Sequence, residues 1–262
     1  QKTSSWIGDF LLIWNCPDLR PLYLEHYSSN SSKLHFFHDR VPNGYQFPGC
    51  RIPFVAGLWP YNYHHSYKDY GIFRGRRTLN GSVVTVFRRP VDRVISAFLF
   101  RNVMLPNGYP KANRSEVKLK ILRSAHPIYS YATMRGIPSC QTKMVMGYKC
   151  GEDILFTEED LEEVKRRIAN DFAFIGLTEE SKATYELFQA MFGVQHLPSP
   201  LPYAMMYRKN SASSIELVGN LTRQLRNLGW TDPFDESLYE EAQRIFYSRC
   251  VLYNVSTLTQ YF

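Results

Sequence analysis

Two adjacent arginines and a nearby serine are the residues of this chain best suited to hold an anion. Arg88 and Arg89 follow a run of β-branched and aromatic residues, and Ser96 lies in the apolar stretch after them. Two positive charges attract an anion, and a hydroxyl group adds a hydrogen-bond donor. These residue types therefore indicate a site for a phosphate-type group.

The elements on either side of the arginine pair are predicted to be a strand and a helix. Residues Ser82 to Phe87 are mostly β-branched or aromatic, which is typical of a buried strand. Pro90 suits the first position of a helix, where its missing N–H costs nothing. Apolar residues then recur with helical spacing, at Val91, Val94, Ile95, Phe98 and Leu99.

A strand that leads directly into a helix places the arginine pair beside the first N–H groups of that helix. The helix dipole is positive at this end, so it repels the two guanidinium groups unless an anion is bound. The pattern predicts a phosphate-type site at the carboxyl edge of an α/β sheet. The alternative is that Arg88 and Arg89 are surface charges in a loop.

The stretch RRPVDRVISAF, which begins at Arg88, resembles the R-D-P-x-x-R-x-x-S-x-F signature of the sulfotransferases. These enzymes use 3′-phosphoadenosine-5′-phosphosulfate (PAPS) as donor. The resemblance implies that Arg88 and Ser96 bind the 3′-phosphate of the donor. Arg89 departs from the family, which usually has aspartate there, and this removes an acidic group from the anion site.

The first residues of the chain resemble the phosphate-binding loop of the same family, P-K-[TS]-G-[ST]-[ST]. Lys2, Thr3, Ser4 and Ser5 would form this loop, with Ser4 in place of the usual glycine, and Trp6 would follow it. The resemblance implies that they cradle the 5′-phosphosulfate, with Lys2 neutralising charge on the bridging oxygen. The family's first strand would then lie before residue 1. The alternative is a polar N-terminal segment, and the chain has no Walker A motif.

His65 is the candidate catalytic base. Glycan O-sulfotransferases carry their catalytic histidine in a G-H-x-x-[YF] segment before the R-D-P strand, and His65 falls in the corresponding place. An imidazole can take the proton of an acceptor hydroxyl near neutral pH. Neighbouring His64 and His65 would point in opposite directions from a strand, which disfavours a metal site. The alternative is a structural histidine bonded to the backbone.

Two later segments also resemble parts of the family. Arg208, Lys209 and Ser211 form a basic turn like the loop that closes over the 3′-phosphate and adenine of the donor. The segment Gln141-Thr142-Lys143-Met144 resembles the Q-T-[RK]-M segment of heparan sulfate 6-O-sulfotransferases, whose neighbours approach donor and acceptor. The alternatives are a solvated turn and a short helix with a disulfide.

The remaining pattern predicts an α/β protein with a mostly parallel central sheet flanked by helices. The resemblance implies a P-loop-like sulfotransferase fold, in one domain over residues 1–262. Besides the elements around Arg88, the sequence predicts a basic helix over 115–124, a helix capped by Thr157, a strand over 172–177, a helix capped by Thr178 and a helix over 236–247. In the helix after Thr178, the residues expected to face inward are Ala183, Leu187, Ala190 and Met191.

Composition points to anionic partners. The chain has a formal net charge of +7 and 15% aromatic residues. Such a field favours anionic partners and does not choose among a nucleotide, a glycan, an acidic peptide and a nucleic acid. A nucleic-acid partner is not expected, because no long basic helix or known binding motif is present. The chain has neither a signal peptide nor an apolar run of about 18 residues, so any membrane anchor would lie outside it.

Cysteines and glycosylation sequons indicate the lumen of the secretory pathway. There is no C-x-x-C pair, so a structural zinc site is not expected. Five N-x-[ST] sequons begin at Asn30, Asn80, Asn113, Asn220 and Asn254. In a lumen, Cys140 and Cys150 would pair around Gly147, Cys16 could pair with Cys50, and Cys250 would be free. The alternative is five reduced thiols in the cytosol.

The resemblance implies a Golgi sulfotransferase most similar to the heparan sulfate 2-O and 6-O enzymes. It would move a sulfuryl group from PAPS to a glycan hydroxyl by in-line displacement, without a metal, and release adenosine 3′,5′-bisphosphate. One alternative is a protein-tyrosine sulfotransferase that acts on acidic tyrosine-containing peptides. Another is a non-catalytic protein that binds anionic glycans on the same fold.

Overall fold

The computed structural model describes residues 55–56, 83–100, 103, 105, 114–192 and 212–258. The chain divides into two compact units. Of the described residues, the first unit holds 88–100, 103, 105, 114–165 and 212–244, and the second holds 55–56, 83–87, 166–192 and 245–258. The single domain expected from the sequence stays a prediction.

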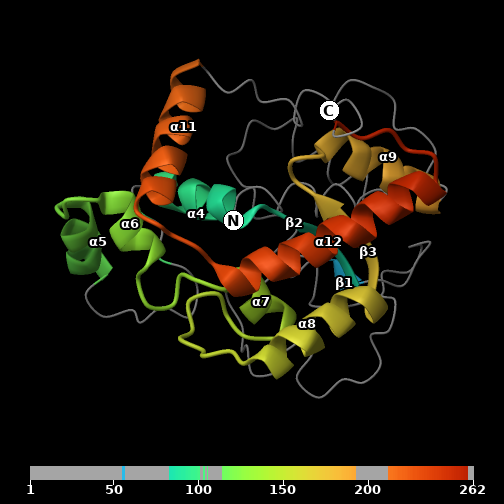
Figure 1. The fold of residues 1–262 in the computed structure, drawn as a ribbon, viewed down its shortest axis with the longest axis horizontal. Helices are drawn as coiled ribbons and strands as arrows, with labels where there is room; N and C mark the ends of the chain where they lie inside the picture. The colour runs from blue at the N-terminus through green and yellow to red at the C-terminus, as the bar shows by residue number, and fades with distance from the viewer. Residues whose placement is uncertain are drawn as a thin grey trace, which may run out of the picture. The chain divides into compact units, whose positions relative to one another are not determined.

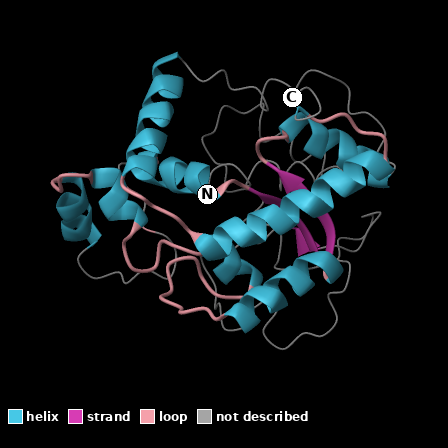
Figure 2. Ribbon diagram, in the orientation of Figure 1, coloured by secondary structure: helices cyan, strands magenta, loops and turns pink. Residues whose placement is uncertain are grey.

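The second unit contains a parallel sheet of order β1-β2-β3 (Figure 2). Its strands are β1 (Val55–Ala56), β2 (Val83–Phe87) and β3 (Phe172–Leu177). Thr85 pairs with Ile175, and Phe87 pairs with Leu177. Both predicted strands are therefore confirmed, and the described part of the chain is compatible with an α/β fold in which helices outnumber strands.

Helix α9 (Ser181–Phe192) packs against β3 (Figure 1). The Oγ1 hydroxyl of Thr184 accepts a hydrogen bond from Leu177 N–H and donates one to its carbonyl, both at 2.9 Å. Ala183 and Leu187 are buried as predicted, whereas Ala190 is exposed and Met191 is half-buried. Thr184 and Phe188 are buried in their place. The predicted stripe was wrong at its end because the side of α9 that faces β3 continues from Phe188 to Phe192, whose ring centroid lies 6.3 Å from that of Phe174 in β3.

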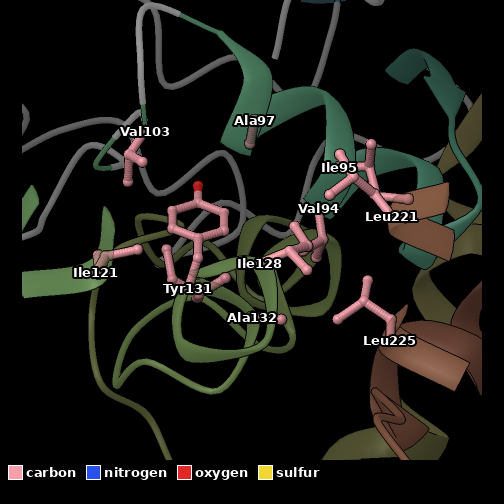
Figure 3. Close-up of a cluster of buried hydrophobic side chains, with 11 residues drawn as sticks. Val94, Ile95, Ala97, Val103, Ile121, Ile128, Tyr131, Ala132, Leu221 and Leu225 are labelled. Atoms are coloured by element: carbon pink, nitrogen blue, oxygen red, sulfur yellow. The ribbon is translucent and has the colours of Figure 1, made fainter. Parts of the chain in front are cut away.

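The core of the first unit is built from four helices. They are α4 (Pro90–Leu99), α5 (Arg114–Leu122), α6 (Pro127–Ala132) and α11 (Ala212–Asn227). The ring of Tyr131 lies among side chains from α4, α5 and α6, including Ala97, Ile121 and Ile128 (Figure 3). Burial raises the pKa of Tyr131 to about 12, so its hydroxyl stays neutral at physiological pH.

Three further helices complete the described chain: α7 (Cys140–Val145), α8 (Glu158–Asn170) and α12 (Pro233–Leu252). Thr157 begins α8 as predicted: its hydroxyl accepts from Asp160 N–H at 3.3 Å, and its own N–H donates to the Asp160 carboxylate at 2.9 Å. The last helix begins at Pro233, earlier than predicted. No helix in the described part of the chain is both long and apolar enough to cross a membrane.

The cysteine predictions are confirmed where the structure describes them. Cys140 and Cys150 form a disulfide, and the loop that it closes turns at Gly147, whose φ is +87°. Cys250 is a free, buried thiol. The predicted pair Cys16–Cys50 lies outside the described residues.

Candidate anion site and the polar network beside it

Of the predicted site residues, the structure describes Arg88 and Ser96. Each is half-buried, so each keeps some surface that a ligand can reach. The other predicted site residues lie outside the described part of the chain: Lys2, Thr3, Ser4, Ser5, Trp6, His65, Arg208, Lys209 and Ser211.

The turn that carries Arg88 and Arg89 has the predicted form. Strand β2 ends at Phe87, and Pro90 is the first residue of α4. Arg89 is the N-cap residue, with φ −51° and ψ 131°, because a residue before proline is restricted to extended conformations. Its carbonyl accepts from Arg93 N–H at 2.9 Å, which starts the helix.

Arg89 and Ser96 lie on one face of α4, together with Asp92. These three positions are spaced by three and four residues, so their side chains share a side of the helix. Arg89 Nε lies 3.2 Å from the Asp92 carboxylate, and the two side chains are 56% and 24% exposed. An exposed pair of this kind contributes about 0–1 kcal/mol. The Asp92 carboxylate therefore lies beside Arg89 on the face of α4 that also carries Ser96.

Gln141 of α7 holds the backbone of Arg88 at two points. Its Oε1 accepts from Arg88 N–H at 2.9 Å, and its Nε2 donates to the Arg88 carbonyl at 2.9 Å. Gln141 itself is buried, with 7% of its surface exposed. A buried backbone N–H or carbonyl without a partner lowers stability by about 1–3 kcal/mol. The side-chain amide of Gln141 avoids this cost for both backbone groups of Arg88.

Arg93, the third arginine of the stretch that begins at Arg88, points into the interior. It is 8% exposed, and its Nη2 donates to the Asp232 carboxylate and to the Ile137 carbonyl, each at 3.3 Å. Its Nε lies 3.3 Å from Asp235 Oδ2 without the alignment of a hydrogen bond. Arg93 therefore serves the structure of the first unit, a role that the sequence did not indicate.

Asp232 and Asp235 cap the N-terminus of α7 from the start of α12. Asp232 accepts from Ser139 N–H at 2.9 and 3.0 Å, and Asp235 accepts from the N–H groups of Gln141 at 3.1 Å and Thr142 at 2.8 Å. Both aspartates are 0% exposed. Carboxylates favour this end of a helix because they satisfy its free N–H groups and its dipole. The start of α7 is therefore already occupied by negative charge from the chain itself.

The Asp232 carboxylate also stabilises an unusual backbone conformation at Ser139. This residue has φ +57° and ψ 32°, in the left-handed region that residues other than glycine rarely adopt. The cost of such a conformation is about 1 kcal/mol or more. The bonds from Ser139 N–H and Oγ to Asp232 offset that cost.

Lys143 is buried beside these carboxylates. Its Nζ donates to the Gly136 carbonyl at 3.0 Å and to the Glu152 carbonyl at 2.9 Å. It is 2% exposed, and burial lowers its pKa to about 8. The ammonium group thus ties together backbone on both sides of the disulfide loop.

Burial also shifts the acid side of this network. The pKa of Asp232 is raised to about 7, first by burial and then by the neighbouring Asp235 carboxylate. Arg93 and the Ser139 N–H group counteract part of this rise. The network holds two acidic and two basic side chains, so its formal charges balance when all four are ionised.

One signal for this network was present in the sequence. Asp232 precedes Pro233, which is the pattern of an N-cap residue followed by proline at the first helical position. That pattern places α12 correctly, yet nothing in it shows that the Asp232 side chain serves another helix.

Among the described residues, no group of three or more histidine, cysteine, aspartate or glutamate side chains is arranged to hold a metal ion. No family model, curated protein or solved structure matches this chain.

Proposed function

We propose that this chain is a sulfotransferase that moves a sulfuryl group from PAPS to a hydroxyl group of a glycan. One observation carries the proposal: Arg88 and Arg89 form a strand-to-helix turn whose backbone is fixed by Pro90 on one side and by Gln141 on the other. A turn of this kind is the geometry in which a helix N-terminus and a basic side chain hold a phosphate group.

In the proposed reaction, the acceptor oxygen forms a bond to sulfur while the bond from sulfur to the phosphate oxygen breaks. His65 takes the proton of the acceptor hydroxyl, and Lys2 stabilises the charge that develops on the leaving oxygen. Arg88 and Ser96 bind the 3′-phosphate. Residues of the first loop and of the late basic turn complete the donor site, namely Thr3, Ser4, Ser5, Trp6, Arg208, Lys209 and Ser211.

The proposed location is the lumen of the secretory pathway. The Cys140–Cys150 disulfide supports it, because disulfides persist in oxidising compartments and are rare in the cytosol.

The donor site is tested by thermal unfolding with adenosine 3′,5′-bisphosphate, with ATP as the comparison ligand. Ligand at about 100 times its Kd adds about 2.7 kcal/mol of stability. We expect this shift for the wild type and its loss in Arg88→Ala. Arg123→Ala, which removes an exposed arginine next to α5, is the matched control and should keep the shift. A wild type that is indifferent to the bisphosphate would refute the proposal.

The acceptor class is tested by transfer of radiolabelled sulfate from PAPS. Desulfated heparan sulfate should gain label, whereas an acidic tyrosine-containing peptide should not. Label on the peptide alone would identify a protein-tyrosine sulfotransferase. Glycan binding without any response to nucleotide would identify a non-catalytic binding protein.

A further inference from the structure

We infer that Gln141 is a positioning residue of the donor site, which acts through Arg88 to set the affinity for the 3′-phosphate. This inference rests on the proposed function. It follows from one juxtaposition: both polar groups of one buried side-chain amide bond both backbone groups of the residue expected to carry the phosphate contact.

Glutamine suits this position because it has both a donor and an acceptor at the end of one side chain. Arg88 presents an N–H and a carbonyl, and the amide of Gln141 matches them at 2.9 Å each. An ionised glutamate offers no donor, and methionine of similar length offers neither group. Position 141 therefore requires a side chain of this length that carries both a donor and an acceptor.

The backbone of Gln141 is itself held in place before any ligand binds. The Gln141 N–H donates to Asp235, and the disulfide of Cys140 fixes the residue before it. Asp235 is fully buried and lies in α12, so it does not move freely with the turn. Gln141 is thus anchored through its backbone and can impose its side-chain geometry on Arg88.

The consequence is a fixed starting point for the Arg88 side chain. Pro90 restricts Arg89, and Gln141 bonds the only two backbone polar groups of Arg88. The Cα–Cβ bond of Arg88 therefore leaves the turn in one direction. Without Gln141 the turn can sample others, and some of the orientation needed for a charged hydrogen bond would have to be established when the ligand binds.

A purely structural role for Gln141 predicts different behaviour. If the amide only satisfied buried backbone groups, its loss would lower stability and weaken all ligands alike. A positioning role predicts an effect that needs the 3′-phosphate and needs Arg88. The two roles are therefore separated by comparing ligands and by combining variants.

The experiment measures the Kd of adenosine 3′,5′-bisphosphate and of adenosine 5′-monophosphate by calorimetry, with the full chain. Gln141→Met should raise the Kd of the bisphosphate by about tenfold, which is the scale of one hydrogen bond to a charged group. It should leave the Kd of the monophosphate unchanged. In an Arg88→Ala background, the same change should have no further effect. Gln224→Met, a half-buried glutamine of α11, should change neither Kd.

Each outcome decides between the proposals. Equal bisphosphate affinity in Gln141→Met and wild type overturns the inference and leaves the proposed function standing. Additive losses in the double variant, or equal losses for both ligands, also overturn it in favour of a structural role. A wild type that does not bind the bisphosphate refutes both. If Gln141→Met does not fold, Gln141→Asn takes its place, because its shorter amide stays polar but cannot reach both groups of Arg88.

Discussion

At the scale of single residues, several charged side chains of the first unit are buried and bonded to other buried polar groups. Arg93, Asp232 and Asp235 are all nearly or fully inaccessible to water, and each has partners from a distant part of the chain. Buried ion pairs of this kind add little net stability, but removing one partner is costly because it leaves an uncompensated charge. Their effect is to fix the positions of the groups they join, here the start of α7 and the Gln141 residue within it.

The raised pKa of Asp232 gives a prediction about pH. Between about pH 4 and pH 7 the folded protein binds more protons at Asp232 than the unfolded chain does. This group therefore makes the free energy of unfolding fall as pH rises, by at most about 1.4 kcal/mol per pH unit. Urea unfolding across this range should show that the fall is reduced in Asp232→Asn.

Glu162→Gln is the control for that experiment. Glu162 is 72% exposed and pairs with Lys165 on the surface of α8. Its replacement should leave the pH dependence as in the wild type. Identical slopes for Asp232→Asn and wild type would mean that Asp232 is ionised throughout this range.

At the scale of elements, local signals placed most of the helices and strands. The run of β-branched and aromatic residues before Pro90 and the helical spacing of apolar residues after it mark β2 and α4 correctly, because a buried strand favours the former and burial of one helix face imposes the latter. Helix α11 was not predicted, although Val218, Leu221 and Leu225 have helical spacing.

The contact between β3 and α9 depends on a glycine. A Cβ atom on Gly176 would lie 2.3 Å from Thr184 Cγ2 and 3.1 Å from Phe174 Cε1. Gly176→Ala should therefore lower the free energy of unfolding by about 1–3 kcal/mol, since the packed helix would have to move. Urea unfolding measures this loss.

Gly219→Ala is the matched control in α11. A Cβ atom there would meet nothing within 4 Å, and alanine is favoured over glycine inside a helix by about 0.5–1 kcal/mol. This variant should be as stable as the wild type or more so. A neutral Gly176→Ala would show that α9 does not pack closely against β3.

At the scale of the whole molecule, charge and cysteine chemistry bear on where the protein works. The net charge of +7 favours anionic ligands at any site on the surface. The disulfide and the five sequons both suit an oxidising lumen. Of the described sequons, Asn254 lies in a turn just after α12, with φ +55°, and its side chain is exposed.

Secretion should therefore attach a glycan to Asn254. Expression through the secretory pathway, followed by peptide-N-glycosidase digestion and mass spectrometry, should show a modified peptide that contains this residue. Ser256→Ala should remove the modification, because it breaks the sequon while leaving the left-handed asparagine in place. An unmodified Asn254 in secreted wild type would count against this placement.

The sequence by itself determined the local features of this protein: the strand and helix around Arg88, the start of α4 at Pro90, the cap of α8 and the pairing of Cys140 with Cys150. Each of these depends on residues that are close together in the chain, where backbone sterics and short loop closure decide the outcome. Only the tertiary structure decided that Asp232 and Asp235 cap α7 and that the Gln141 side chain forms hydrogen bonds with the backbone of Arg88. Those contacts join residues far apart in sequence, and hydrogen-bond complementarity between distant groups leaves no periodic signal to read.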